Sequence, residues 1–524
     1  MQNGSRELVL NAGAGVWPGD VVAAAGPRFG LADGGGSATL RRTWLDTFDW
    51  RLYRAGLTLE QVSRAAMSEL TLTARDGEVV AAAPLAAGRP GSRVSWPSLL
   101  SGLPVGPLRE RLEPVVGVRA LMPVARAVSK VREQRVLNSD GKTVARIAVD
   151  RMAVTYPSRA QAAPRLLLRP VRGYQAQASR LASALLAVPG VAEASLPVLD
   201  LALAAAGHYP AESAVRADIQ LDADMPAAAA LATVLTALLD TLEANVSGTI
   251  RDIDTEFLHD LRIAVRRTRS ALKLAGGALP DRLARRFRPE FRWLGALTTP
   301  TRDLDVYLEE FPRMAAGLVA ASPAELAPLL EHLAADRAAA QRQLARGLRS
   351  ARFSRLAAQW REALAGVPAS ARSRPRAGQL AAGRIAHANQ RVLAGGAAIT
   401  PASPAASLHE LRKRCKELRY LMEMFRSLHD PAEHWRAVRE LKALQDCLGE
   451  FQDTDVQAAR LRAFADQLME EKVAPAATLL AMGEIAAGLT RRERKARGEF
   501  DERFRDFISP PSQDRIRALT AAAR

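Results

Sequence analysis

Two stretches of the sequence place histidine, arginine and lysine at helical spacing. One is "FLHDLRIAVRRTRSALK", residues 257–273, and the other is "LHELRKRCKELR", which begins at residue 408. With about 100° of turn per residue, the cations of each stretch fall on one stripe of a helix. Stripe one is formed by His259, Arg262, Arg266, Arg269 and Lys273, and stripe two by His409, Arg412, Lys416 and Arg419. Guanidinium and imidazole groups in such a row can contact successive phosphate oxygens, so the stripes predict binding of a polyanion.

An apolar stripe borders each basic stripe. It is formed by Leu258, Leu261, Val265 and Leu272 in the first stretch and by Leu408, Leu411, Cys415 and Met422 in the second. A basic stripe beside a buried seam is expected to point into a groove between helices, where low-dielectric walls strengthen the attraction for an anion. A stripe that served only solubility would lie opposite the seam.

A structural role for the stripes is the alternative. Four carboxylates, expected at the starts of neighbouring helices, could cap those helices and neutralise the arginines; they are Asp303, Asp305, Asp453 and Asp455. Each histidine could equally be a hydrogen-bonded structural residue. Capping or ion pairing is favoured over metal binding for the aspartates, so we predict no metal site, no cofactor and no catalytic residue in these motifs.

The two motifs recur at one offset. Leu-His-Asp-Leu-Arg is repeated as Leu-His-Glu-Leu-Arg, with 409 − 259 = 150, and "RDLDV" is repeated as "QDTDV", with 453 − 303 = 150. Two motifs that repeat at the same offset predict a duplicated helical unit with pseudo-twofold symmetry.

The composition is compatible with this prediction. The 524 residues include 73 Lys and Arg against 56 Asp and Glu, a formal charge of +17, and this balance favours a polyanionic partner. Cys415 and Cys447, the only cysteines of the sequence, are expected in the core and fit a reducing cytosol. Without a signal peptide pattern or an uninterrupted apolar segment of membrane-spanning length, we predict a cytoplasmic protein with no membrane contact.

The texture of the chain divides it into two parts. Residues 1–210 carry short extended runs separated by turn signals, which predicts an α+β domain, and residues 211–225 read as a linker. Residues 226–510 consist of long Ala-, Leu- and Arg-rich segments, which predicts an all-α domain of two similar helical bundles at 226–365 and 379–510, followed by a tail at 511–524. The basic run from Arg491 to Arg497 is interpreted as a solvated helix face, with the rim of the groove as the alternative, and Phe500, Phe504 and Phe507 follow at packing spacing.

The helical part resembles the CHAD domain, an all-helical family built from two four-helix repeats. The paired histidine motifs together with "TRDLDV" and "FQDTDV" carry the resemblance, which covers about residues 225–510. It implies that stripes one and two line a basic surface that binds inorganic polyphosphate, with association with polyphosphate granules as a further expectation. Gln452 stands where the first repeat has Arg302, which argues against a second cation from that position.

The N-terminal part resembles the CYTH domain, an antiparallel triphosphate tunnel. The stretch "WLDTFDWRLYRAGLTL", residues 44–59, carries the resemblance, supported by "KVREQRV" and "VARIAVD". The family's metal-binding carboxylates are missing, because Glu7 is alone in the first strand and "RLLLRPVRG" has none. The resemblance therefore implies a divergent domain without triphosphatase activity, in which four cations could attract phosphate or simply be solvated: Lys130, Arg132, Arg135 and Arg146.

Three functions follow from these patterns. The first is a polyphosphate-binding protein, and the second is a metal-dependent triphosphatase or polyphosphatase, which the missing carboxylates disfavour. The third is nucleic-acid binding, since the same arginines would attract a phosphodiester backbone. Stacking aromatics are scarce beside the stripes, where only Tyr420 adjoins one, so nucleic acid is the disfavoured polyanion.

Overall fold

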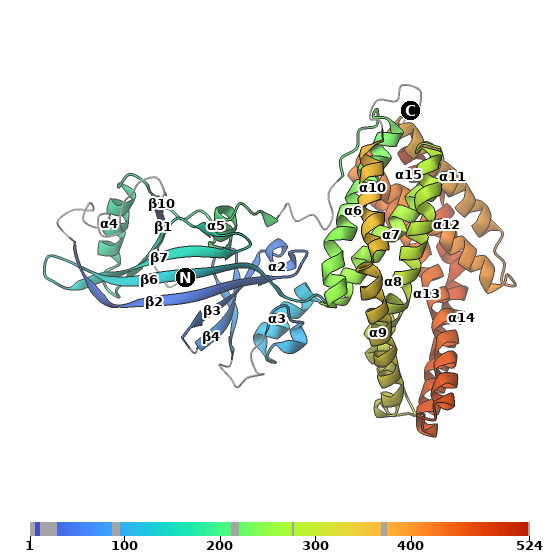
Figure 1. The fold of residues 1–524 in the computed structure, drawn as a ribbon, viewed down its shortest axis with the longest axis horizontal. Coiled ribbons are helices and arrows are strands. Elements are labelled where there is room, and N and C mark those ends of the chain that lie inside the picture. Colours follow the sequence, from blue (N-terminus) through green and yellow to red (C-terminus); the bar gives the residue numbers. More distant parts are fainter. Residues whose placement is uncertain are drawn as a thin grey trace. The chain divides into compact units, whose positions relative to one another are not determined.

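The computed structural model describes residues 6–10, 29–65, 67–85, 95–210, 219–274, 277–367 and 375–521 (Figure 1). The chain forms two compact units, Met1–Val215 and Arg216–Arg524, and each is considered by itself. Much of the predicted linker, residues 211–218, lies outside the described residues, as do residues 368–374 between the two helical repeats.

The N-terminal unit is built on one antiparallel sheet, as the sequence predicts. Its strands run in the order β10-β1-β9-β7-β6-β2-β3-β4-β5, and β8 pairs with β7. The strand bounds are β1 (Arg6–Leu10), β2 (Gly30–Asp46), β3 (Leu57–Arg64), β4 (Met67–Ala74), β5 (Val79–Leu85), β6 (Met122–Leu137), β7 (Thr143–Tyr156), β8 (Ala160–Gln161), β9 (Arg165–Pro170) and β10 (Val191–Glu193). The antiparallel sheet is compatible with the expected tunnel architecture.

Short helices cover parts of this sheet. They are α2 (Arg51–Arg54), α3 (Pro107–Val116), α4 (Gln175–Leu186) and α5 (Val198–Ala205). Leu181 and Leu185 of α4 pack with Leu166 and Leu168 of β9, whereas Leu108 and Leu112 of α3 pack with the leucines of β3 and β4. Because side chains alternate between the two faces of a strand, the residues that face away from these helices are available for a polar interior.

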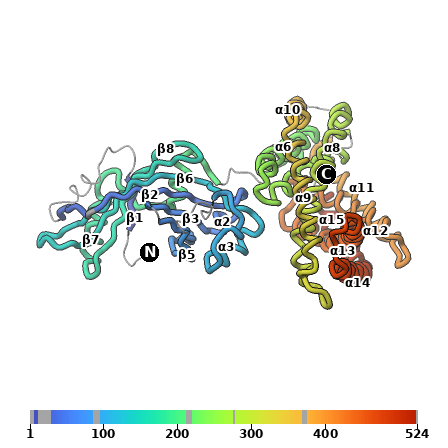
Figure 2. Tube along the Cα trace, turned by 60° about the horizontal axis from the view of Figure 1, so that its bottom comes forward, coloured from blue at the N-terminus to red at the C-terminus, as the bar shows by residue number. Residues whose placement is uncertain are grey.

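The C-terminal unit is helical in all its described elements apart from turns and one isolated bridge, as the sequence predicts (Figures 1 and 2). Its α-helices are α6 (Ala227–Arg251), α7 (Thr255–Leu274), α8 (Asp281–Ala316), α9 (Ala327–Leu348), α10 (Ala351–Ala365), α11 (Ala377–Ala397), α12 (Ala405–Met424), α13 (Pro431–Glu470), α14 (Ala476–Ile508) and α15 (Pro510–Ala521).

The order of these helices shows the duplication. Helices α6 to α10 and α11 to α15 form two series, and α8 and α13 begin 431 − 281 = 150 residues apart, the offset of the sequence motifs. In both series the first four helices pack successively, and the short fifth helix packs on the first. Each repeat therefore adds one short helix to the four that the family resemblance implies.

Helix α15 occupies most of the predicted tail, residues 511–524. Ile516 and Leu519 are 1% and 2% exposed and belong to the core of the helical unit. These two apolar residues, three positions apart, lie on one helix face and pack α15 on the second repeat.

One apolar core crosses both repeats. It includes Leu261 and Val265 of α7 together with Leu411 and Cys415 of α12. A second core joins the C-terminal halves of α8 and α13 with the N-terminal halves of α9 and α14. The two repeats are consequently held together by shared packing along their length.

Helix α6 is long and apolar enough to cross a membrane, with a mean hydropathy of 1.5 over its best window. Half of that window is buried inside the protein, where Leu231, Leu235 and Leu239 contribute to the core. Its apolar character is thus used for packing. Gly248 lets α7 approach closely, because a Cβ there would lie 2.2 Å from the ring of Phe257.

Candidate anion-binding surface on α7 and α12

Stripe one lies on α7 and stripe two on α12, and these two helices contact each other. The apolar residues that border the stripes are all buried, with exposures of 0–3% for the four on α7 and 0–1% for the four on α12. The predicted apolar face of both helices is confirmed as buried. The packing of the apolar face fixes the direction in which each basic stripe points.

Two arginines of stripe one, Arg262 and Arg266, have neutral hydrogen-bond acceptors. Arg262 Nη1 donates to the Thr299 hydroxyl at 2.7 Å, and longer bonds reach the Thr298 hydroxyl at 3.3 Å and the Gly295 carbonyl at 3.4 Å. Arg266 Nη2 donates to the hydroxyl of Tyr420 on α12. Since hydroxyl and carbonyl oxygens carry no net charge, these bonds hold the two guanidiniums in place without neutralising them.

Arg269 lies against α8. A Cβ at position 295 would come within 2.7 Å of Arg269 Nη1, so Gly295 leaves the space that this exposed arginine occupies. Burial lowers the pKa of Arg262, and the like charges of Arg266 and Arg269 act in the same direction while Asp303 opposes them. The positive charges of Arg266 and Arg269 thus disfavour the charge on Arg262.

Stripe two holds its equivalent arginine differently. Arg412, the counterpart of Arg262, donates to the Gln452 amide oxygen at 2.6 Å and to Asp453 Oδ1 at 3.0 Å. Gln452 also lies 3.5 Å from His409 Nε2. Gln452, which stands where the first repeat has Arg302, thus contacts both Arg412 and His409 of stripe two. Asp453 partly neutralises the charge of Arg412.

Lys416 connects the two stripes. Burial lowers its pKa to about 8, and the next causes are the positive charges of Arg412 in its own stripe and Arg266 in the other. Asp453 opposes this shift. Arg412 lies one turn before Lys416 on α12, and Arg266 of α7 reaches Tyr420 one turn after it. Cations from both repeats therefore gather around Lys416, and an anion placed there would relieve their mutual repulsion.

Two members of the stripes are directed toward carboxylates. Lys273 pairs with Glu417 of α12, and Arg419 Nε lies 3.6 Å from Glu423 on its own helix. The sequence places both cations on their stripes, but it does not reveal these partners. Their charge is less available to an external anion than that of Arg262 or Arg266.

The expected aspartate caps are wrong as caps. Asp303 and Asp305 lie inside α8, and Asp453 and Asp455 lie inside α13, far from either helix start. Their short sequence motifs resemble helix starts, but both helices run on for two turns or more beyond them. As ion-pair partners they divide: Asp453 binds Arg412 of stripe two, whereas Asp303 binds Arg460 at 3.2 Å and Asp305 binds Arg337 at 2.9 Å.

Both stripe histidines are held toward the neutral form. Burial lowers the pKa of His259, and Arg302 acts in the same direction. Burial also lowers the pKa of His409, followed by the charges of Lys413 and Arg412. At neutral pH an imidazole in either position can donate one hydrogen bond but adds no full charge.

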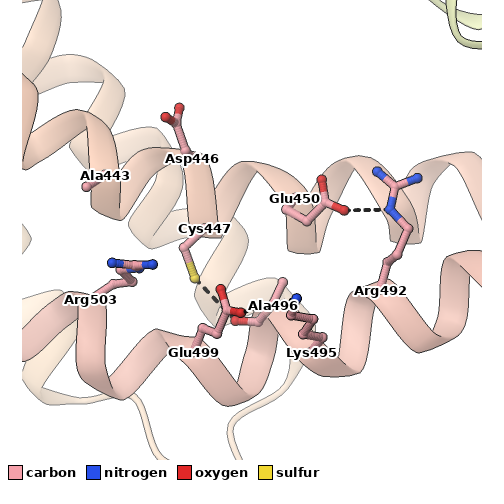
Figure 3. Close-up of a pocket in the computed structure, with 9 residues that line it drawn as sticks. All are labelled: Ala443, Asp446, Cys447, Glu450, Arg492, Lys495, Ala496, Glu499 and Arg503. Carbon is pink, nitrogen blue, oxygen red and sulfur yellow. Dashed lines mark hydrogen bonds and ion pairs between the residues drawn. The ribbon is translucent and has the colours of Figure 1, made fainter.

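A cavity of about 600 Å³ lies away from the stripes, between α13 and α14 (Figure 3). Three carboxylates and three cations line it, and Arg492 pairs with Glu450 at 2.7 Å. Cys447 donates its thiol to the Ala496 carbonyl, and burial raises its pKa to about 11. With balanced charges and a protonated thiol, this cavity lacks the excess charge of the stripes and does not form an anion site.

The C-terminal basic run also serves local structure. Besides the pair made by Arg492, Arg497 donates to the carbonyls of Pro401 at 2.8 Å and Ser403. Phe500, Phe504 and Phe507 are buried in the core, as their spacing predicts. The cysteine prediction is confirmed as well, since Cys415 and Cys447 are free and buried.

The four basic residues singled out in the N-terminal unit do not share one face. Arg135 and Arg146 lie opposite each other on β6 and β7, and Arg146 pairs with Glu133 at 2.8 Å. Lys130 and Arg132, at even positions of β6, point to the other face of the sheet. The structure therefore divides these cations between two surfaces.

A polar cluster on several strands was missed by the sequence reasoning. Arg42 of β2 lies 2.9 Å from Glu60 of β3 and 3.4 Å from Asp150 of β7, and Glu7 of β1 pairs with Arg165 of β9. Burial raises the pKa of Glu60, against the nearby guanidiniums. The signal was present as single charged residues alternating with apolar ones in the middle strands, but only the sheet register brings them together.

Within the described ranges, no group of three or more His, Cys, Asp or Glu side chains could hold a metal ion. In the polar cluster, each of the three carboxylates pairs with a guanidinium: Glu60 and Asp150 pair with Arg42, and Glu7 pairs with Arg165.

Comparison with known proteins places a family match inside the helical unit. Residues 233–462 match the model of the CHAD domain family. Among solved structures, the crystal structure of the CHAD domain from the plant Ricinus communis is 24% identical, with a TM-score of 0.40, over 58% of this chain and 94% of that one. PptA from Streptomyces chartreusis is 19% identical, with a TM-score of 0.44, over 53% of this chain and 99% of that one. No curated protein matches the chain.

Proposed function

We propose that the helical unit, which carries a CHAD domain, binds inorganic polyphosphate on stripes one and two. The observation that carries the proposal is the gathering of cations from both repeats around Lys416, where Arg262 and Arg266 are held by neutral oxygens. A row of phosphates would supply the negative charge that these groups lack.

The chemistry of the stripes fits an inorganic chain of phosphates. Guanidinium groups form charge-assisted hydrogen bonds with phosphate oxygens, and successive i, i+3 and i, i+4 positions repeat this along α7 and α12. An elongated ligand could contact both helices, since they touch at the seam where Arg266 reaches Tyr420. A small anion would use only a part of this surface.

Tyr420 also distinguishes between polyanions. The guanidinium carbons of Arg266 and Arg419 each lie 5.7 Å from the centre of its ring. Two guanidiniums thus already lie beside this ring, and stacking on aromatic rings is a main source of affinity for single-stranded nucleic acid. This arrangement supports inorganic polyphosphate over DNA or RNA.

For the N-terminal unit we propose a divergent CYTH-like domain without triphosphatase activity. The carboxylates of its polar cluster are paired with Arg42 and Arg165. Because carboxylates committed to guanidiniums are poor ligands for a divalent ion, a metal-assisted hydrolysis has little support here. Phosphate release from tripolyphosphate in the presence of Mg²⁺ or Mn²⁺ would contradict this proposal.

Titration calorimetry of the full chain with long-chain polyphosphate, at near-physiological salt, tests the main proposal. A variant with Arg262, Arg266, Arg412 and Arg419 changed to Gln should lose binding while its circular dichroism stays helical. The matched control changes Arg282, Arg285, Arg292 and Arg355 to Gln, four exposed arginines on α8 and α10 outside the stripes.

The control variant removes the same charge, so it separates a specific surface from general attraction. We expect the control to retain most of the wild-type affinity and a DNA oligonucleotide to compete poorly. Equal losses in the two variants, or equal competition by DNA, would show that the stripes attract anions without selecting polyphosphate.

A further inference from the structure

Two ion pairs cross the seam between α7 and α12. Arg267 Nη2 lies 2.6 Å from Glu423 Oε2, and Lys273 pairs with Glu417. In both pairs α7 contributes the cation and α12 contributes the carboxylate. The charges at this seam are therefore separated by repeat.

The internal duplication relates these two pairs to each other. Position 267 corresponds to 267 + 150 = 417, and position 273 corresponds to 273 + 150 = 423. The contact between positions 267 and 423 is thus the pseudo-twofold image of the contact between 417 and 273. In a true twofold interface such a contact would be made twice by identical residues.

The sign of the charges differs between the two copies of this contact surface. If two copies of the first repeat met through the same geometry, Arg267 of one would face Lys273 of the other. If two copies of the second repeat met, Glu417 would face Glu423. Both like-repeat pairings place equal charges together, and only the pairing of unlike repeats gives two attractive contacts.

The apolar core does not provide this discrimination by itself. Leu261 and Val265 of α7 and Leu411 and Cys415 of α12 are similar apolar residues at equivalent positions. Hydrophobic attraction is non-directional, so burial alone favours like and unlike pairings in nearly the same way. Charged groups can separate them, because a wrong partner brings direct repulsion.

We propose that Arg267, Lys273, Glu417 and Glu423 make the α7–α12 seam a recognition surface that accepts the other repeat and rejects a second copy of the same repeat. The consequence is that two chains do not associate through like repeats, although their apolar faces would permit it. This inference does not depend on polyphosphate binding.

The carboxylates are well placed for this role. Glu417 and Glu423 are only 15% and 27% exposed. Each also has an arginine in its own repeat, with Arg391 2.9 Å from Glu417 and Arg419 3.6 Å from Glu423. These second partners restrain the two carboxylates and so lower the entropy lost when the pairs across the seam form.

Two variants with identical composition test the proposal. Arg267→Glu with Glu417→Arg makes both contacts between unlike repeats repulsive and both contacts between like repeats attractive. Arg267→Glu with Glu423→Arg only exchanges the members of one pair and leaves every contact between unlike repeats attractive. The new arginine at 417 lies beside Arg391, and the new arginine at 423 lies beside Arg419. Each variant therefore adds one repulsion within the second repeat, and this effect is matched between them.

Thermal unfolding and sedimentation velocity of the full chain provide the readouts. The first variant is expected to melt roughly 5 °C below the second, and 1 M salt should shrink this difference. A dimer formed by the first variant, absent from the second and from the wild type, would show the like-repeat pairing directly. A melting difference without dimers still supports selection at the seam, whereas equal melting of the two variants would overturn it.

Discussion

The two helical repeats share one arrangement of cations and differ in what holds them. In the first repeat Arg262 donates to Thr299, and in the second the counterpart Arg412 has Gly449 at the position of that threonine and turns to Gln452 and Asp453. A neutral acceptor leaves the positive charge available, and a carboxylate reduces it. Duplication has kept the stripe, while changes on the neighbouring helix have altered how much charge each copy presents.

The largest expected effect is a difference between the two repeats in their contribution to polyphosphate affinity. Changing Arg262 and Arg266 to Gln should weaken polyphosphate binding by roughly 100-fold or more, since each charge-assisted bond contributes on the order of 1.5–3 kcal/mol. Changing Arg412 and Arg419 to Gln should cost about tenfold, because both arginines already have carboxylate partners. Calorimetry on the two double variants measures the difference. Equal losses would mean that the carboxylates do not reduce the charge that the ligand meets.

Acid stability should also differ between the repeats. Leu279 of the first repeat corresponds to His429 of the second, and both are buried. Burial lowers the pKa of His429 to about 4 from its ordinary 6.5, so this residue costs stability as the pH falls from 6.5 toward 4. The free energy of unfolding should drop by roughly 2 kcal/mol between pH 7 and pH 5 from this group.

Replacing His429 by leucine should remove much of that acid sensitivity. Denaturant unfolding at pH 7 and pH 5 is the measurement, and His387→Leu, an exposed histidine on α11, is the control. His434 stacks against His429 and retains part of the effect, because burial lowers its pKa as well. An unchanged pH dependence in His429→Leu would show that other groups govern acid unfolding.

A smaller effect should appear in the pH dependence of binding. Lys416 has a pKa of about 8 and corresponds to Arg266 of the first repeat. As the pH rises above 8 the ammonium loses its proton, so affinity for polyphosphate should fall severalfold by pH 9.5. Lys416→Arg should abolish this fall, because a guanidinium stays charged. Binding titrations at pH 7 and 9.5 decide it, and a parallel decline in both proteins would assign the titration elsewhere.

The smallest expected effect concerns Asp453. Its side chain is 61% exposed and pairs with Arg412, so Asp453→Asn should free that arginine and raise affinity about threefold. Asp446→Asn removes the same charge from α13 beside Lys442 and serves as the control. A gain of equal size in both variants would mean that the net charge of the protein, and not the pair of Asp453 with Arg412, sets the affinity.

Much of the helical unit could be predicted from single residues and their spacing. The burial of Leu258, Leu261 and Val265 follows from their place beside the cations of α7, and the second copy repeats it on α12. Asp303 and Asp453 were misplaced at helix starts because a short acidic motif resembles a cap, whereas α8 and α13 run through it. Local pattern identifies an element more surely than it identifies where the element ends.

The sequence by itself determined the two basic stripes, their apolar borders and the duplication, because a helix turns by a fixed angle per residue and a repeat has a fixed offset. Only the tertiary structure decided which cations have neutral partners and which have carboxylates. Arg266 and Tyr420 are 154 positions apart, and Lys273 and Glu417 are 144 apart. Periodicity along one helix carries no information about such neighbours, which meet only when the two repeats pack on their shared core.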